Sequence, residues 1–91
     1  MSVLLITHAL KNQSKDYSPF FNMIKTSCTE WWHYFDYTWI VVTPHTAEQF
    51  AKLLYPHMER DDRLLVVKLQ KEYQGWLEPD AWNWLNLKDF S

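Results

Sequence analysis

The chain has 91 residues, which is enough for one packed domain but too few for two separate cores. Hydrophobic residues make up 47% of it and aromatic residues 18%, with six tryptophans, so many large side chains must be buried. Its formal charge of −2, from 9 basic and 11 acidic side chains, argues against a general electrostatic nucleic-acid binder, because such proteins cluster lysine and arginine. We expect one domain over residues 1–91, with a core in about residues 1–70 and a tryptophan-rich tail in about residues 71–91.

The cysteine content and the N-terminal segment both bear on where the protein is located in the cell. Cys28 is the only cysteine, so no intramolecular disulfide can form and nothing indicates an oxidising compartment. The opening segment MSVLLITHAL has no basic n-region, and its apolar run is too short for a signal peptide or a membrane span. We therefore expect a soluble cytoplasmic protein without a membrane partner.

The first strand and helix are indicated by two apolar patterns. Residues 3–7 are apolar and rich in β-branched side chains, which predicts a central strand covered on both faces. A helix should follow over about residues 19–27, with Ser18 as its N-cap and Pro19 in its first turn. One face of this helix carries three apolar side chains that should pack on the sheet: Phe20, Phe21 and Ile24.

The aromatic segment WWHYFDYTWIVVT, which follows Glu30, predicts a hairpin with its turn at residues 36–38. Side chains alternate between the two faces of a strand. The first strand of the hairpin should therefore separate Trp31, His33 and Phe35 on one side from Trp32 and Tyr34 on the other.

A second helix and a fourth strand are predicted next. Thr46 and Gln49 have the spacing of a capping box, which predicts a helix over about residues 47–58. The run RLLVVKL at residues 63–69 predicts another strand covered on both faces. In the tail, Pro79 can open a short helix that should dock on the domain, on a second copy of the chain, or on both.

The predicted order of elements is β-α-β-β-α-β, followed by a short C-terminal helix. With right-handed crossovers this order gives a ferredoxin-like α+β fold, a four-stranded antiparallel sheet with two helices on one face. The chain has a single glycine, so glycine-rich phosphate-binding loops and the enzymes that use them are excluded.

Few residues suggest catalysis or cofactor binding. His8 follows the first predicted strand and is the one candidate general acid or base. Asp36, Asp61 and Asp62 carry the oxygen ligands that Mg²⁺ prefers, but each lies in a predicted turn, where aspartate is common for conformational reasons. The histidines and the cysteine lack the spacing of a zinc site, so we expect no metal and no cofactor.

Lysines and tryptophans are the side chains of this sequence that suit binding to nucleic acid or to a partner. Aromatic rings can stack on single-stranded bases or contact a protein, and lysines can contact phosphates. The candidates for binding nucleic acid or a partner are Lys11, Lys15, Trp82 and Trp84.

Six segments resemble small bacterial proteins of the SinR family: VLLITHAL, DYSPFFNMIK, WWHYFDYTWIVV, TAEQFAKLL, DDRLLVVKL and GWLEPDAWNWL. In architecture this family is similar to the CRISPR adaptation endonuclease subunit and to the VapD toxin ribonuclease, which pair as ferredoxin-like homodimers. In those nucleases an aspartate ends the first strand and the paired copies hold a metal, whereas the matching position here is His8. An imidazole is a poor ligand for Mg²⁺, so the resemblance does not carry over metal-dependent cleavage.

The resulting hypothesis is a non-catalytic homodimeric module that binds nucleic acid or a protein partner, with a defence or mobile-element role implied by the resemblance. One alternative is a ribonuclease that uses paired His8 side chains, which is the only enzymatic reading of the sequence. A second alternative is a protein-binding inhibitor or adaptor with the tryptophan-rich tail as its contact surface.

Overall fold

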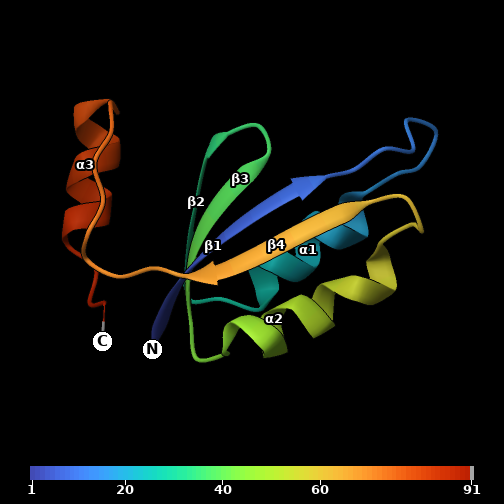
Figure 1. Cartoon of the computed structure of the whole chain (residues 1–91), viewed down its shortest axis with the longest axis horizontal. Coiled ribbons are helices and arrows are strands. Elements are labelled where there is room, and N and C mark those ends of the chain that lie inside the picture. The colour runs from blue at the N-terminus through green and yellow to red at the C-terminus, as the bar shows by residue number, and fades with distance from the viewer. Residues whose placement is uncertain (91) are drawn as a thin grey trace.

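In the computed structural model, which describes residues 1–90, four antiparallel strands form one sheet in the order β2-β3-β1-β4 (Figure 1). The strands are β1 (Ser2–Ala9), β2 (Glu30–Phe35), β3 (Thr38–Thr43) and β4 (Arg63–Lys68), and the helices are α1 (Ser18–Thr26), α2 (Ala47–Leu54) and α3 (Pro79–Asn86). The fold is the predicted ferredoxin-like α+β arrangement, followed by a short C-terminal helix. No helix within residues 1–90 has the length and apolar character needed to cross a membrane.

The helix ends follow local hydrogen bonding. The Asp16 carboxylate accepts from the backbone N–H and the hydroxyl of Ser18, so Asp16 supplies the side-chain bonds at the start of α1 and the predicted Ser18 N-cap is wrong. The predicted capping box of α2 is confirmed by reciprocal bonds between Thr46 and Gln49. This helix ends at Leu54 rather than at residue 58, because Pro56 has no N–H to continue the ladder and a 3₁₀ turn takes over.

Two hydrophobic clusters lie on opposite faces of the sheet. The helix-side cluster joins α1 and α2 to the strands through Leu4, Ile6, Phe20, Ile24, Trp39, Val41, Phe50 and Leu54. The tail-side cluster packs α3 on the other face through Val3, Trp32, Ile40, Val42, Ala81 and Leu85. Figure 1 shows α3 on the side of the strands away from α1 and α2.

Side-chain contacts hold the tail on its own domain. The Lys88 ammonium forms an ion pair with Glu30 of β2. The Tyr73 hydroxyl donates to the Asn86 side-chain oxygen at 2.9 Å, and the Tyr73 ring stacks on Trp82. The sequence left open where this tail docks, and the structure places it against the sheet of the same chain.

The strand β4 differs from its prediction. It is an edge strand of the sheet, and the tail-side cluster does not extend over it. Leu65 is 58% exposed and Val67 is 41% exposed, whereas Leu64 and Val66 are half-buried against the helix-side cluster. The strand β4 was expected to be covered on both faces, but only its helix-side face is covered.

Candidate functional site

His8, the predicted catalytic candidate, is enclosed by the helix side of the fold. Alternation along β1 turns its side chain toward the helices together with Leu4 and Ile6, and only 7% of the residue is exposed. Its Nε2 accepts a hydrogen bond from the indole N–H of Trp39 at 3.2 Å. The rings of Phe20 and Phe21 lie 5.5 and 5.7 Å from the imidazole.

The charge state of His8 follows from this environment. Burial lowers its pKa, and electrostatic repulsion from nearby His33 lowers it further. Because Nε2 is the acceptor, the neutral ring carries its proton on Nδ1, which is buried and has no hydrogen-bond partner within residues 1–90. In the single chain, His8 is therefore a neutral packing residue that solvent hardly reaches.

Lowering the pH from about 7.5 to 5 is expected to lower the free energy of unfolding through His8, by up to about 1.4 kcal/mol per pH unit. Its folded pKa lies below the ordinary value of 6.5, so the unfolded chain takes up the proton first. This stability is fully present above that value and is lost as the pH falls toward the folded pKa. Urea unfolding of the wild type and His8→Leu across this range measures the effect, and equal slopes in the two proteins would contradict it.

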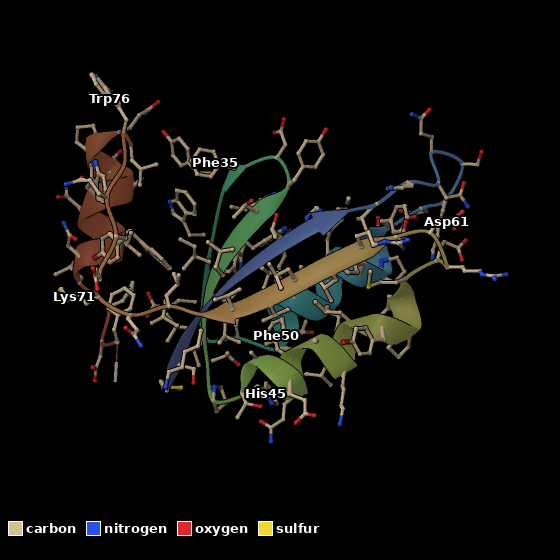
Figure 2. All side chains as sticks on the ribbon, viewed as in Figure 1. Phe35, His45, Phe50, Asp61, Lys71 and Trp76 are labelled. Carbon is tan, nitrogen blue, oxygen red and sulfur yellow. The ribbon has the colours of Figure 1, made fainter. Side chains whose placement is uncertain are left out.

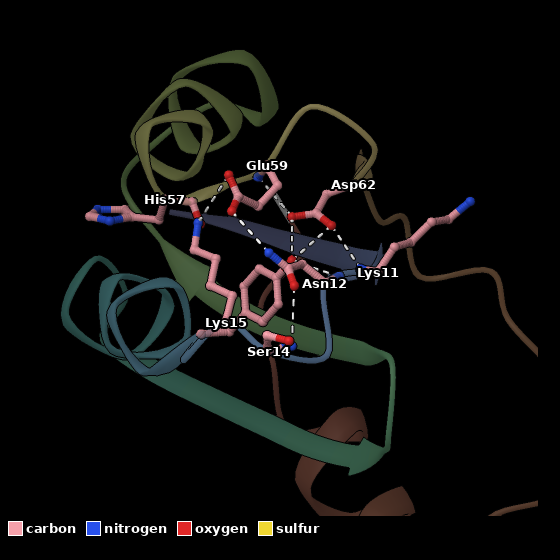
Figure 3. Close-up of polar contacts among 8 residues, drawn as sticks. Lys11, Asn12, Ser14, Lys15, His57, Glu59 and Asp62 are labelled. Atoms are coloured by element: carbon pink, nitrogen blue, oxygen red, sulfur yellow. Dashed lines mark hydrogen bonds and ion pairs between the residues drawn. The ribbon is translucent and has the colours of Figure 1, made fainter.

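Lys11 and Lys15, predicted to bind a partner, lie in the loop after β1 beside the acidic turn before β4 (Figure 3). The Lys15 ammonium donates to the carbonyl oxygen of His57 at 3.1 Å and pairs with Glu59 at 3.9 Å. Lys11 contributes its backbone N–H, which donates to Asp62 at 2.8 Å, while its ammonium extends away from the turn. Of these two lysines, Lys11 is therefore the one whose ammonium is free to meet a ligand.

Asp62 is the centre of this turn. Its buried carboxylate accepts from the N–H of Lys11 and of Glu59, each at 2.8 Å, and from the Tyr17 hydroxyl at 2.9 and 2.8 Å. Burial raises the pKa of Asp62, but these hydrogen bonds outweigh it and the net pKa is lowered. The carboxylate thus joins the β1–α1 loop to β4, and its oxygens already have donors.

The described residues contain no cluster of side chains that could bind a metal ion. Within residues 1–90, no three histidine, cysteine, aspartate or glutamate side chains lie close enough together to hold an ion. Asp36 and Asp61 are exposed at separate turns, the first in the hairpin and the second before β4.

Trp82 and Trp84, the other predicted binding residues, are half-buried in the tail. Trp82 stacks on Tyr73, and the Lys88 ammonium lies 4.5 Å from the centre of the Trp84 ring. Figure 1 shows α3 at one end of the molecule and the loop after β1 at the other. The predicted lysines and tryptophans therefore do not form one site.

A groove between the hairpin and the tail exposes several aromatic side chains. It consists of two adjoining hollows of about 480 and 200 Å³, which share Phe35, Trp76 and Leu77. Trp76 is 99% exposed, Phe35 is 50% exposed and Tyr34 is 46% exposed. Figure 2 shows Phe35 at the hairpin and Trp76 on the tail, on the same side of the molecule. We call this surface the aromatic groove; Tyr34, Phe35, Trp76, Leu77, Glu78 and Pro79 line its larger hollow.

An irregularity in β2 directs Phe35 into the groove. The pairing register with β3 shifts between Trp32 and Phe35, which breaks the side-chain alternation. The Phe35 ring packs edge-on against Trp32 at 5.6 Å, and Tyr34 stacks on Trp32 at 5.3 Å. The prediction that Phe35 lies on the side of Trp31 and His33 is wrong for this reason.

The aromatic groove has an acidic side. Interaction of the Tyr34 hydroxyl with the Glu78 carboxylate, burial and the negative charges of Glu78 and Asp80 raise the pKa of Tyr34. An acidic rim on aromatic walls suits a cationic group, because ring faces and carboxylates both attract positive charge.

The sequence carried little signal for this groove. Trp76 lies in a segment without helical or strand periodicity, so its exposure could not be inferred from its neighbours. The one available clue was the mixture of aromatic and acidic residues after Gly75. The predictions instead placed binding at Lys11 and Lys15 and on α3, at Trp82 and Trp84.

Comparison with known protein families finds none that matches this chain. Curated proteins and solved structures give no match either. The SinR resemblance therefore stays a prediction.

Proposed function

We propose that this chain is a non-catalytic interaction module that binds a protein partner in the aromatic groove. The exposure of Trp76 carries the proposal: a whole indole lies in solvent beside the half-exposed rings of Phe35 and Tyr34. Burying an aromatic side chain of this size contributes about 2 kcal/mol or more, and tryptophan is enriched among the residues that dominate protein interfaces.

The charges around the groove favour one chemistry of partner. Glu78 and Asp80 attract lysine and arginine and repel a phosphate backbone. A lysine or arginine side chain also has an apolar stem that can lie against Leu77 and Pro79 while its charged end meets the aromatic faces. The partner is therefore a peptide segment with a basic residue between apolar ones.

The states of His8, the predicted catalytic candidate, and of Cys28, the single cysteine, support a non-catalytic role. His8 is neutral and enclosed, with its Nε2 bonded to Trp39. Burial raises the pKa of the Cys28 thiol to about 11, so little thiolate is present at neutral pH. We place the module in the cytoplasm, where a lone cysteine stays reduced.

Trp76→Ala is expected to weaken binding of a lysine peptide by about tenfold or more, because the substitution removes one wall of the cation site. The probe is a short labelled peptide with one lysine between leucines, and its twin carries norleucine, which keeps the stem and removes the charge. The wild type should prefer the lysine peptide, and Glu78→Gln should reduce that preference. Fluorescence anisotropy gives each dissociation constant.

Trp31→Ala is the matched control, because it removes another partly exposed indole on the helix side of the sheet. It should leave peptide binding unchanged. Labelled single- and double-stranded RNA and DNA are titrated in parallel at low and near-physiological salt. Peptide binding that Trp76→Ala does not alter, or salt-sensitive nucleic-acid binding in its place, would refute the proposal.

A further inference from the structure

One side of β4 remains open in the single chain. The run RLLVVKL is typical of a strand covered on both faces, but the side chains of Leu65 and Val67 project from the uncovered face. The outer edge of the strand has no neighbouring strand within residues 1–90. An exposed apolar edge strand is a template for pairing with another chain.

The pattern of hydrogen bonds between β1 and β4 shows which backbone groups of β4 have no partner in β1. The N–H of Leu69 donates to the carbonyl oxygen of Val3 at 2.8 Å, which extends the β1–β4 ladder by one residue. Antiparallel partners alternate between bonded and non-bonded pairs, so the residues at 63, 65 and 67 direct their N–H and C=O groups toward β1. The backbone groups of Leu64, Val66 and Lys68 consequently point outward.

We propose that a second copy of this chain pairs antiparallel with β4 about a twofold axis at Val66. Val66 then exchanges two backbone hydrogen bonds with Val66 of the second copy. Leu64 likewise exchanges two backbone hydrogen bonds with Lys68 of the second copy. On the open face, Leu65 lies opposite Val67 of the second copy, and the twofold axis repeats the contact. The apolar side chains of both copies form one patch.

The charges beside the strand complement one another in this register. Counted along the two chains from this axis, Asp61 corresponds to Lys71 of the second copy and Arg60 to its Glu72, with Arg60 and Asp61 in the turn before β4 and Lys71 and Glu72 in the segment after it. Figure 2 shows Asp61 in the turn before β4 and Lys71 in the tail segment after it. Both side chains are exposed, and neither has an ion pair with any of the residues 1–90. The interface provides each of them with a partner.

Neighbouring registers lack this match. Pairing centred on Val67 would set Arg63 against Lys71, and pairing centred on Leu64 would set Arg60 against Lys68. An axis at Leu65 would place Asp61 opposite Leu69. An axis between two residues would put helix-side residues opposite open-face residues, which a continuous sheet does not allow. Alternation therefore requires an axis at a residue, and the charges then select Val66.

A charge-reversal pair tests the register by sedimentation equilibrium over the micromolar range. The wild type should be a dimer, and Asp61→Lys should weaken dimerisation by about tenfold, because two attractive contacts become repulsive. Adding Lys71→Asp should restore wild-type dimerisation. A wild type that remains monomeric overturns the proposal and leaves β4 to a different partner. A dimer that is insensitive to Asp61→Lys overturns the register.

Cross-linking provides a second readout in a Cys28→Ala background. Val66→Cys should form an intermolecular disulfide on oxidation, because paired Cα atoms across the axis are about 5.5 Å apart, within disulfide range. Val67→Cys is the control, since it faces residue 65 of the second copy rather than itself. Equal cross-linking at the two positions would overturn the Val66 axis.

Discussion

Trp39→Ala is expected to lower the free energy of unfolding by about 4 kcal/mol, the cost typical of deleting a large buried aromatic side chain. Trp39 is 1% exposed and lies under His33, whose ring stacks on it at 3.8 Å. The rings of Trp31 and Phe21 also pack on it. The truncation would leave a cavity among these rings and would remove the donor to His8.

Trp76→Ala is the control for this prediction, because it deletes the same group from an exposed position. It should leave the free energy of unfolding unchanged while it weakens peptide binding. Urea unfolding followed by circular dichroism, at equal protein concentrations, separates the two variants. A Trp39→Ala protein as stable as the wild type would show that the aromatic packing in β2 and β3 is not as described.

Asp62→Ala should cost about 3 kcal/mol of unfolding free energy, because it leaves three donors without their acceptor. These donors are the Lys11 N–H, the Glu59 N–H and the Tyr17 hydroxyl. Asp36→Ala, at an exposed turn, should change stability little and serves as the control. Loss of the same free energy in both variants would contradict the structural role of Asp62.

The same carboxylate predicts an acid dependence. Its folded pKa is below the ordinary value of 3.8, so its stabilisation is present above that value and is lost as the pH falls through the folded pKa. Asp62→Asn, which keeps the side-chain shape, should flatten this part of the acid unfolding curve. An unchanged curve would mean that other groups control acid unfolding.

Local patterns were sufficient to predict most of the fold. The apolar run at residues 3–7, the turn after Phe35 and the Thr46–Gln49 capping box each depend on neighbouring residues, and each is present in the structure. The errors were also local. The Ser18 N-cap was wrong because the Asp16 carboxylate makes the bonds to Ser18, and the length of α2 was overestimated because Pro56 ends it.

The candidate site could not be predicted because it depends on contacts between distant segments. The shift in register that turns Phe35 toward the tail comes from pairing with β3, which strand alternation does not encode. Trp76 lines the same hollow as Phe35 only after α3 docks on the far face of the sheet. His8 was singled out from its position at the end of a strand, but which face it occupies was not established from the sequence.

Selection of random displayed peptides against the wild-type protein, with Trp76→Ala as the counter-selection, tests the central claim most directly. The account predicts enrichment of sequences with lysine or arginine between apolar residues, which bind the wild type and not the variant. Enrichment that is equal on the two proteins, or no enrichment at all, would show that the aromatic groove is not a protein-binding site.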